Sequence, residues 1–314
     1  MSFIDHINAC NRWHPADFVP FVVDGERLGS VRRTFAAELA DVTRDFVFRT
    51  QDLEPGLSDG LSAGLHWISA PAGFDARGDA MLALCRELQR QGLVSHLHGE
   101  RYPVTPGHRD QARFLIDRAC APYFGVRAFG QHLNGFVRRR DGLYLWVARR
   151  SASRRVYPNH LDNMVAGGLP WGIGLRENLC KECFEEASMP ASIAERALPV
   201  GAISYCRDSD RGLKPDVIYC YDLELDEHFK PHCNDDEVAG FHLWPVAKIM
   251  ALVAETSEFK LNCNLVIIDF LIRHGLLGPE HPDYLDLVQG LRSPLAADAR
   301  PADPVCASAT PDFT

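Results

Sequence analysis

Residues 167–189 read GGLPWGIGLRENLCKECFEEASM. A glycine-rich turn over 167–174 precedes a segment whose spacing predicts a helix that ends at Ala187. On a helix that advances about 100° per residue, three carboxylates fall in one arc: Glu182, Glu185 and Glu186. An apolar row lies beside that arc: Leu175, Leu179, Cys183 and Ala187. The stretch therefore predicts an acidic helix that follows a tight turn and packs on a core.

The clustering of the three glutamates predicts a bound cation. Like charges at i and i+4, here Glu182 and Glu186, destabilise an isolated helix by roughly a few tenths of a kcal/mol. Mg²⁺ is a hard ion that binds through a few carboxylates and keeps waters and substrate phosphate oxygens as its other ligands. A solvated acidic face is the alternative interpretation, with Glu177 and Lys181 as an ordinary i,i+4 pair.

The turn and the helix together resemble the Nudix box: a glycine, five residues, a glutamate, seven residues, then Arg-Glu-apolar-x-Glu-Glu-x-Gly-apolar. Aligned on Gly167, the chain departs from this pattern at three positions: Ile173 for the first glutamate, Lys181 for the arginine and Ser188 for the last glycine. The resemblance implies an α/β/α sandwich with a mixed sheet. It also implies a metal site on Glu182, Glu185, Glu186 and Gly167. The resemblance implies that Ile173, in place of the first glutamate, weakens a helix-stabilising contact and with it the anchoring of the loop, more than it affects metal binding.

The resemblance extends beyond the box, through Leu161–Pro170, Gly201–Tyr205 and Tyr219–Leu223. These segments are similar to a Nudix branch that carries an extra N-terminal domain and includes relatives of the Nudix part of fungal thiamine pyrophosphokinases. It implies Mg²⁺- or Mn²⁺-dependent hydrolysis of a diphosphate linkage, with damaged thiamine diphosphate cleaved to the monophosphate. Two alternatives stay open: a non-catalytic sensor of a nucleotide or cofactor, and a Nudix-fold diphosphate isomerase.

Several further residues are candidates for the site. Glu237, in an acidic segment, is our candidate for an additional ligand or base, although short Asn/Asp clusters also form turns. Arginines could hold substrate phosphates by charge-assisted hydrogen bonds, and Trp171 could stack on a heteroaromatic ring. The arginine candidates are Arg149, Arg155 and Arg207. Cys180 and Cys183 have a metal-like spacing, but without a second pair we expect them to pack in the core.

Composition restricts the class of protein. A formal net charge of −9 opposes binding to nucleic acid, and ten dispersed cysteines suit a reducing cytoplasm. No apolar run approaches the roughly 20 residues of a membrane span, and the first residues lack the pattern of a secretory signal. We therefore expect a cytoplasmic enzyme with a small-molecule diphosphate substrate and neither a nucleic-acid nor a membrane partner. A homodimer is left open.

A chain of 314 residues has room for about two domains. We expect an N-terminal α+β domain over 1–122, a Nudix domain over 123–292 and a loose tail over 293–314. Periodicity predicts helices at Phe3–Asn11, Arg33–Val42, Ala80–Gln91 (capped by Asp79), Ala112–Cys120, Val246–Glu255, Cys263–His274 and Tyr284–Leu291. Strands are predicted at Phe18–Val23, Gly29–Val31, Leu65–Ser69, Asn134–Arg138, Leu143–Ala148, Gly201–Cys206 and Val217–Leu223.

Overall fold

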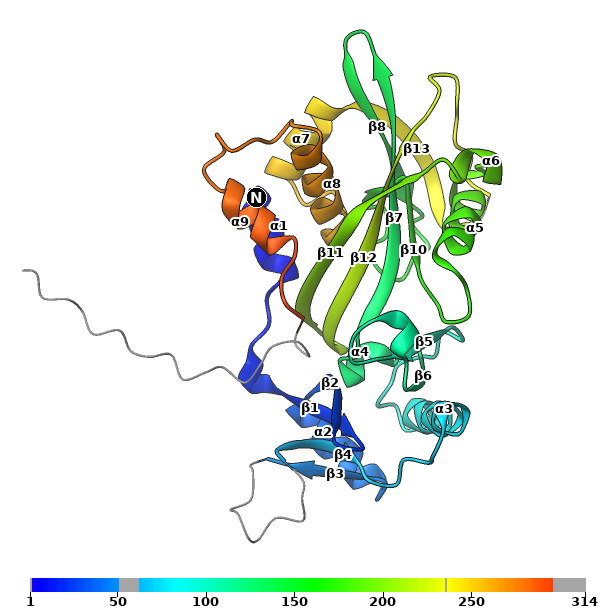
Figure 1. The fold of residues 1–314 in the computed structure, drawn as a ribbon, viewed down its shortest axis with the longest axis vertical. Helices are drawn as coiled ribbons and strands as arrows, with labels where there is room; N and C mark the ends of the chain where they lie inside the picture. The colour runs from blue at the N-terminus through cyan, green and yellow to red at the C-terminus, as the bar shows by residue number, and fades with distance from the viewer. Residues whose placement is uncertain (1, 51–61, 235, 296–314) are drawn as a thin grey trace, which may run out of the picture.

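The computed structural model describes residues 2–50, 62–234 and 236–295. The expected tail, 293–314, therefore lies largely outside the described residues. Figure 1 shows two layered parts, with a small sheet at the bottom and a larger sheet flanked by helices at the top. Three short elements lie between the two sheets: β5 (Arg101–Val104), β6 (Phe114–Asp117) and α4 (Ala121–Phe124).

The first part is built on a four-stranded sheet in the order β2-β1-β4-β3. Its hairpin turn needs left-handed backbone at Asp24 (φ 50°) and Gly25 (φ 79°), which Asp and Gly tolerate best. A separate pair, β5 and β6, follows. The strands are β1 (Phe18–Val23), β2 (Glu26–Arg32), β3 (Phe46–Arg49), β4 (Gly64–Trp67), β5 (Arg101–Val104) and β6 (Phe114–Asp117). The helices are α2 (Arg33–Val42), α3 (Phe74–Arg90) and α4 (Ala121–Phe124).

The helix predicted at Ala112–Cys120 is wrong, because Phe114–Asp117 forms strand β6. All four side chains of β6 are buried. The carboxylate of Asp117, its last residue, accepts hydrogen bonds from the backbone N–H groups of His98, Gly99 and Ala119. Helix α3 also begins earlier than predicted, at Phe74, so that Asp79 lies inside it rather than at its cap. Both differences come from tertiary packing, which periodicity does not report.

The second part is a seven-stranded sheet in the order β11-β12-β7-β8-β13, with β10 paired to β7 and β9 to β8. Strands β12 and β7 are parallel and the other pairs are antiparallel, so the sheet is mixed, as predicted. The strands are β7 (Ala128–Arg139), β8 (Gly142–Arg150), β9 (Leu161–Asn163), β10 (Val165–Gly168), β11 (Leu198–Ser209), β12 (Gly212–Glu224) and β13 (Val238–Pro245).

Helices cover both faces of this sheet, which confirms the predicted α/β/α sandwich. One face carries α5 (Leu175–Ala187) and α6 (Ala191–Ala194), and the other carries α7 (Val246–Glu255) and α8 (Leu261–Arg273). Two short helices from the ends of the described chain join the second face, α1 (Phe3–Cys10) and α9 (Tyr284–Gly290). The first helix therefore packs in the core of the second part.

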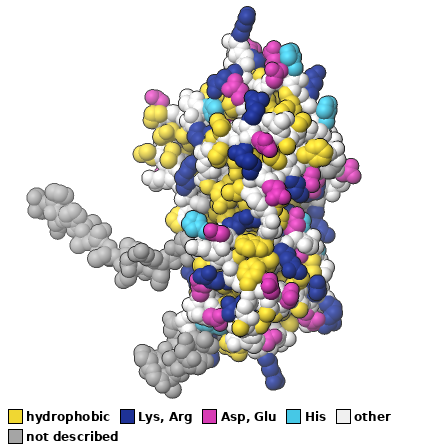
Figure 2. Space-filling view, turned by 45° about the vertical axis from the view of Figure 1, so that its right-hand side comes forward, with side chains coloured by type: hydrophobic (Ala, Val, Ile, Leu, Met, Phe, Trp, Pro, Cys, Tyr) yellow, Lys and Arg dark blue, Asp and Glu magenta, His cyan; other side chains and the backbone are white. Residues whose placement is uncertain are grey.

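The core of the first part continues through Phe124 and Val126, just before β7 begins at Ala128. On the face shown in Figure 2, Lys and Arg side chains lie among Asp and Glu side chains, with no continuous basic region on that face. Among the described helices, none is long and apolar enough to cross a membrane.

Candidate functional site

Helix α5 carries the three glutamates along the edge of its buried face. Leu179, Cys183 and Ala187 are fully buried in one core cluster with side chains of β7 and β10. This packing orients the helix, so the carboxylates that flank the apolar row lie where the helix meets the sheet. The side chain of Glu182 is only 15% exposed, whereas that of Glu185 is 43% exposed. The sequence pattern therefore places the glutamates at a partly buried edge of the helix.

Gly167 on β10 lies directly against Glu182. A β-carbon added at Gly167 would come within 2.6 Å of the Glu182 Cγ, and its carboxylate would be as close. Real β-carbons do not approach other heavy atoms so closely, so any side chain here would displace the glutamate. The structure thus brings the predicted residues Gly167 and Glu182 together and gives a steric reason for glycine at 167.

Glu186 is the most buried of the three glutamates. Its Oε2 accepts a hydrogen bond from the backbone N–H of Ala166 at 2.9 Å. Burial, with the nearby charge of Asp162 added, raises the pKa of Glu186 to about 8. Burial also raises the pKa of Glu182. Two carboxyls that are costly to ionise together need a nearby positive charge if both are to be ionised.

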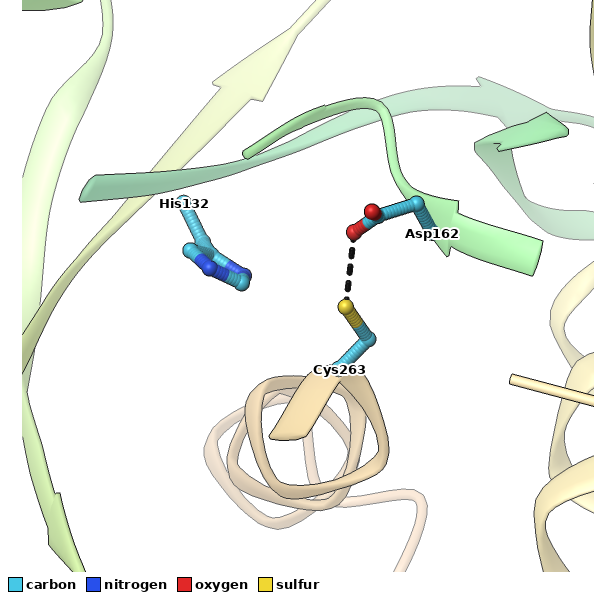
Figure 3. Close-up of side chains that lie close together, drawn as sticks. All are labelled: His132, Asp162 and Cys263. Carbon is cyan, nitrogen blue, oxygen red and sulfur yellow. Dashed lines mark hydrogen bonds between the residues drawn. The ribbon is translucent and has the colours of Figure 1, made fainter. Parts of the chain in front are cut away.

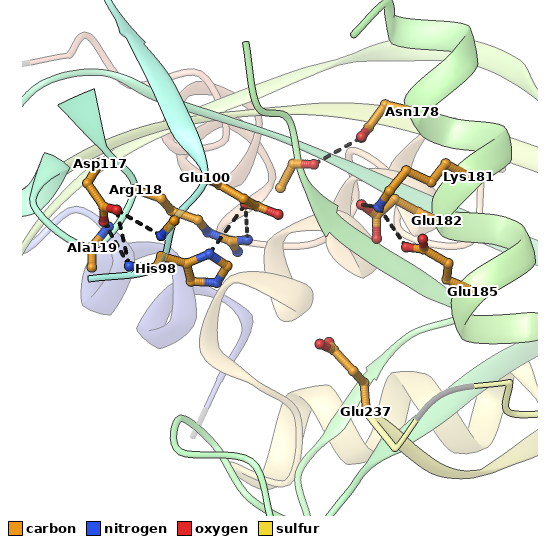
Figure 4. A network of polar contacts seen from close by, with 12 residues as sticks. His98, Glu100, Asp117, Arg118, Ala119, Asn178, Lys181, Glu182, Glu185 and Glu237 are labelled. Carbon is orange, nitrogen blue, oxygen red and sulfur yellow. Dashed lines mark hydrogen bonds and ion pairs between the residues drawn. The ribbon is translucent and has the colours of Figure 1, made fainter. Parts of the chain in front are cut away.

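Lys181 supplies part of that charge. Its Nζ donates to Glu185 Oε2 at 2.6 Å and to Glu182 Oε1 at 3.3 Å. Figure 4 shows Lys181 between Glu182 and Glu185 on one side of α5. The lysine at the box arginine position therefore pairs with Glu182 and Glu185, and among the described residues its ion pairs do not include Glu186.

The donor set of the three glutamates suits a hard divalent cation. Carboxylate oxygens are the ligands that Mg²⁺ and Mn²⁺ prefer, and Glu182 and Glu186 already occupy positions that penalise their uncompensated charge. Glu185 sits one residue before Glu186, on the exposed side, and would exchange its lysine partner for the metal. We therefore regard Glu182, Glu185 and Glu186 as the residues that would hold the metal.

Asn178 is a site residue that the sequence interpretation missed. It is fully buried one helical turn before Glu182, and its amide donates to Gln131 Oε1 at 2.8 Å and to Gly168 O at 2.9 Å. These bonds tie the first turn of α5 to both β7 and β10. The i,i+4 spacing from Asn178 to Glu182 was a usable signal, because a polar residue on a helix's buried face requires partners.

A second cluster of side chains that can bind metals includes Asp162, whose charge acts on Glu186. The ligand atoms of His132, Asp162 and Cys263 are all within 4.8 Å of one another, and Figure 3 shows the Cys263 thiol bonded to Asp162. Asp162 already forms ion pairs with Arg150 at 2.8 Å and Lys260 at 3.3 Å. Burial alone would raise the pKa of Asp162, but these cations hold it at about 2. This carboxylate is neutralised by protein side chains, in contrast to Glu186.

His132 in that cluster is held as a neutral ring. Its Nδ1 pairs with Asn163 Oδ1 at 2.7 Å, and burial lowers the pKa of the imidazole to about 4. Asp162 is within electrostatic reach of Glu186, so the cluster helps to raise the glutamate's pKa. We interpret the His132, Asp162 and Cys263 cluster as a structural support of the site.

Three other predicted site residues, Glu237, Arg149 and Arg155, have different surroundings from the glutamates. Glu237 forms an ion pair with Arg154 at 2.5 Å, and no interaction drawn in Figure 4 joins it to Glu182 or Glu185. Arg149 donates to Asn159 O at 2.7 Å, and Arg155 is exposed in the loop after β8.

Trp171 and Arg207 face other surroundings. The Trp171 ring contacts Phe74 and the guanidinium of Arg109, both from the first part of the chain. Arg207 follows Tyr205 on the face of β11 that packs on the opposite helices, and it lines a cavity with Arg12, Trp13 and Arg32. Because α5 covers the other face, the structure does not bring Arg207 to the glutamates.

Metal affinity is expected to rise with pH up to about pH 8. In the metal-free protein Glu186 keeps its proton below its pKa of about 8, and a cation must displace that proton to bind. The apparent association constant should therefore increase by up to about tenfold per pH unit between pH 6 and 8 and level off above. Calorimetric titration with Mn²⁺ at four pH values measures this. An affinity that does not change from pH 6 to 9 would contradict it.

Ser188 stands at the position of the last glycine of the box, and we expect its replacement by glycine to stabilise the protein. It ends α5 in left-handed backbone, with φ 50° and ψ 32°, a conformation that costs residues with a β-carbon about 1 kcal/mol. Ser188→Gly should raise the free energy of unfolding by about 0.5–1 kcal/mol in chemical denaturation. Ser188→Ala, which keeps the β-carbon, is the control and should not stabilise the protein.

Comparisons with known proteins show which family the chain belongs to. Residues 2–128 match the family described as Domain of unknown function (DUF4743). The chain is 41% identical to Nudix hydrolase 20, chloroplastic, of Arabidopsis thaliana over 294 residues, which cover 93% of this chain and 78% of that protein. It is 40% identical to Nudix hydrolase 24, chloroplastic, of the same plant over 295 residues, with the same shares covered.

Among solved structures, DR0079 from Deinococcus radiodurans is 24% identical, with a TM-score of 0.41 over 54% of this chain and 97% of that one. The two Arabidopsis proteins carry the argument, because their similarity runs through both parts of the chain and is far above the level of chance. Together with the box on β10 and α5, this similarity shows that the chain belongs to the Nudix hydrolases, enzymes that cleave diphosphate linkages.

Proposed function

We propose that the protein hydrolyses a small organic diphosphate with Mg²⁺, or Mn²⁺ in its place, held by Glu182, Glu185 and Glu186. Nudix hydrolases generally use a divalent metal. The observation that carries the proposal is the buried Glu186 carboxyl, whose pKa of about 8 falls to an ordinary value only if a cation binds beside it. Without a cation beside it, this carboxyl would stay largely protonated at neutral pH.

When bound, the metal neutralises the diphosphate and lowers the pKa of a water molecule. The chain's own residues then have three tasks. The Ala166 N–H holds the carboxylate of Glu186 in place, and Gly167 leaves room for that of Glu182. Lys181 balances the charge of Glu185 until the metal binds. Asn178 keeps the first turn of α5 fixed to the sheet, so the carboxylates do not move apart.

The substrate class rests on the resemblance to the Nudix branch related to fungal thiamine pyrophosphokinases. We propose thiamine diphosphate, or an oxidised form of it, as the substrate, with the monophosphate and inorganic phosphate as products. Glu237, Arg149 and Arg155 remain proposals for acid or phosphate contacts. Glu237 lies between β12 and β13, Arg149 lies near the end of β8, and Arg155 lies in the loop that follows β8. We do not carry Arg207 forward, since it faces the other side of the sheet.

The experiment is a turnover screen in Mg²⁺ with products identified by mass. The panel contains thiamine diphosphate, oxidised analogues, nucleoside diphosphate sugars and dinucleotide polyphosphates. A monophosphate product from one class supports the proposal and names the substrate. A rearranged diphosphate would indicate an isomerase, and binding without any product would indicate a sensor. Either of those two outcomes overturns the proposed hydrolysis.

The cellular location is proposed on cysteine chemistry. The nine cysteines of the described residues are free thiols, and most are buried. This state suits a reducing compartment. Two relatives are named as chloroplastic, so the cytoplasm stays a proposal for this chain. Fractionation of the source cells with an antibody to the protein tests it.

A further inference from the structure

The loop that joins β10 to α5, residues 169–174, is held by the first part of the chain. We call it the box loop. The backbone N–H of Trp171 donates to Arg101 O at 2.8 Å, and Leu169 N–H donates to Phe129 O at 3.0 Å. The Trp171 ring packs against Phe74, with ring centroids 5.6 Å apart. The box loop therefore has partners on β5 and α3 as well as on β7.

Arg109 makes the most specific of these contacts. Its Nη2 donates to the carbonyl oxygens of Pro170 and Ile173, the latter at 2.9 Å, and its guanidinium lies 5.8 Å from the centre of the Trp171 ring. One side chain thus connects both ends of the box loop. A guanidinium suits this task, because its planar group offers several N–H donors in fixed directions and stacks on an indole.

The segment that carries Arg109 is itself held in place. Arg127, directly before β7, donates to Gly107 O at 2.6 Å, and Thr105 Oγ1 donates to His108 O at 2.6 Å. Farther along the same hairpin, Arg118 lies against Gly168: a β-carbon added there would be 3.0 Å from its Cζ. Arg118 is fixed in turn by Glu100 at 2.8 Å, as Figure 4 shows. The hairpin of β5 and β6 therefore contacts β10 at Gly168 and also contacts the box loop.

These contacts occur where the chain departs from the Nudix box. Position 173 carries isoleucine, which has no carboxylate to anchor the loop, yet its carbonyl is bound by Arg109. We propose that the first part of the chain is the structural replacement for that glutamate, with Arg109 as a positioning residue. By fixing the box loop, Arg109 sets the start of α5 at Leu175, and with it the contact between Gly167 and Glu182. This inference deepens the proposed function and rests on its metal site.

The test compares Arg109→Gln and Arg109→Lys with the wild-type full-length protein. Arg113→Gln is the matched control, since Arg113 lies on the same hairpin but pairs with Glu26 at 2.6 and 2.9 Å within the first part. Amide hydrogen exchange is measured across the chain, Mn²⁺ affinity by titration, and turnover over a range of Mg²⁺ concentrations. Exchange needs neither metal nor substrate, so it reports on the box loop even if the proposed reaction is wrong.

For Arg109→Gln we expect faster exchange confined to 169–175 and Mn²⁺ affinity lowered by about 10-fold or more, as for other residues that orient metal ligands. Excess Mg²⁺ should restore most of the turnover, which it would not do for a merely unstable protein. Arg109→Lys has a single ammonium group in place of the forked guanidinium, so its exchange rate and Mn²⁺ affinity should lie between those of the wild type and of Arg109→Gln.

Two results would overturn the inference. One is an Arg109→Gln protein that matches Arg113→Gln in all three measurements. The other is faster exchange spread evenly over the sheet, which would indicate a general loss of stability. A wild-type protein that binds no Mn²⁺ while exchange at 169–175 still depends on Arg109 would reject the proposed function and keep the anchoring role.

Discussion

Replacing Glu186 with glutamine is expected to lower kcat/KM by about a thousandfold, which corresponds to roughly 4 kcal/mol of lost transition-state stabilisation. The side chain is buried beside the Ala166 N–H, so glutamine fits the same space but cannot provide a charged ligand. Mn²⁺ binding should fall with activity. Steady-state kinetics on the substrate from the screen and calorimetric Mn²⁺ titration measure the two losses.

The same substitution should stabilise the metal-free protein at high pH. The Glu186 pKa is about 8 in the folded protein, above the value of an exposed glutamate, so stability is lost as pH rises from about 4.5 through 8. Glutamine has no proton to lose, so its melting temperature in EDTA should exceed that of the wild type by several degrees at pH 8 and match it near pH 5.

Glu177→Gln is the control for both effects. Glu177 lies in the first turn of the same helix but is exposed. It should change neither metal affinity nor the pH dependence of melting. If Glu186→Gln bound Mn²⁺ and turned over substrate like the wild type, Glu186 could not be a metal ligand.

Gly167→Ala is expected to lower kcat/KM about a hundredfold. Its β-carbon would overlap the Glu182 side chain, which must then move by about an ångström or more. Displacements of that size in a catalytic group cost on the order of 10²-fold. The effect should appear mainly in kcat and in the Mg²⁺ concentration needed for half-maximal rate, because the carboxylate stays present but shifts.

Gly174→Ala is the matched control. Gly174 lies at the other end of the same segment, has φ −72°, and an added β-carbon there meets nothing within 4 Å. It should leave kinetics unchanged. Equal losses in the two variants would show that general flexibility of the segment matters, rather than the contact between Gly167 and Glu182.

Local sequence patterns predicted much of the second part. The acidic helix ends at Ala187 as expected, Val246–Glu255 has the predicted bounds, and the strands predicted at Asn134–Arg138 and Leu143–Ala148 lie in β7 and β8, which pair as a hairpin. In the first part, Arg33–Val42 also has the predicted bounds. These elements carry their own signals, in helical spacing and in turn residues. Strand β6 carries none that distinguishes it from a helix, because its four residues are all buried.

The sequence alone was enough to predict the chemistry that α5 can present, namely three carboxylates in one arc of a helix that follows a glycine-rich turn. Spacing along a helix and the size of a glycine are local properties, so they can be read without a structure. Only the tertiary structure decided which carboxylate is costly to ionise. The pKa of Glu186 depends on its burial and on Asp162, which comes from another strand.

The tertiary structure likewise decided how the box loop is anchored. Arg109 and Ile173 are far apart in the chain, and the hydrogen bond between them exists only because β5 and β6 fold against the end of the larger sheet. Burial, electrostatic neighbours and contacts between distant segments all depend on packing, which a local pattern does not contain.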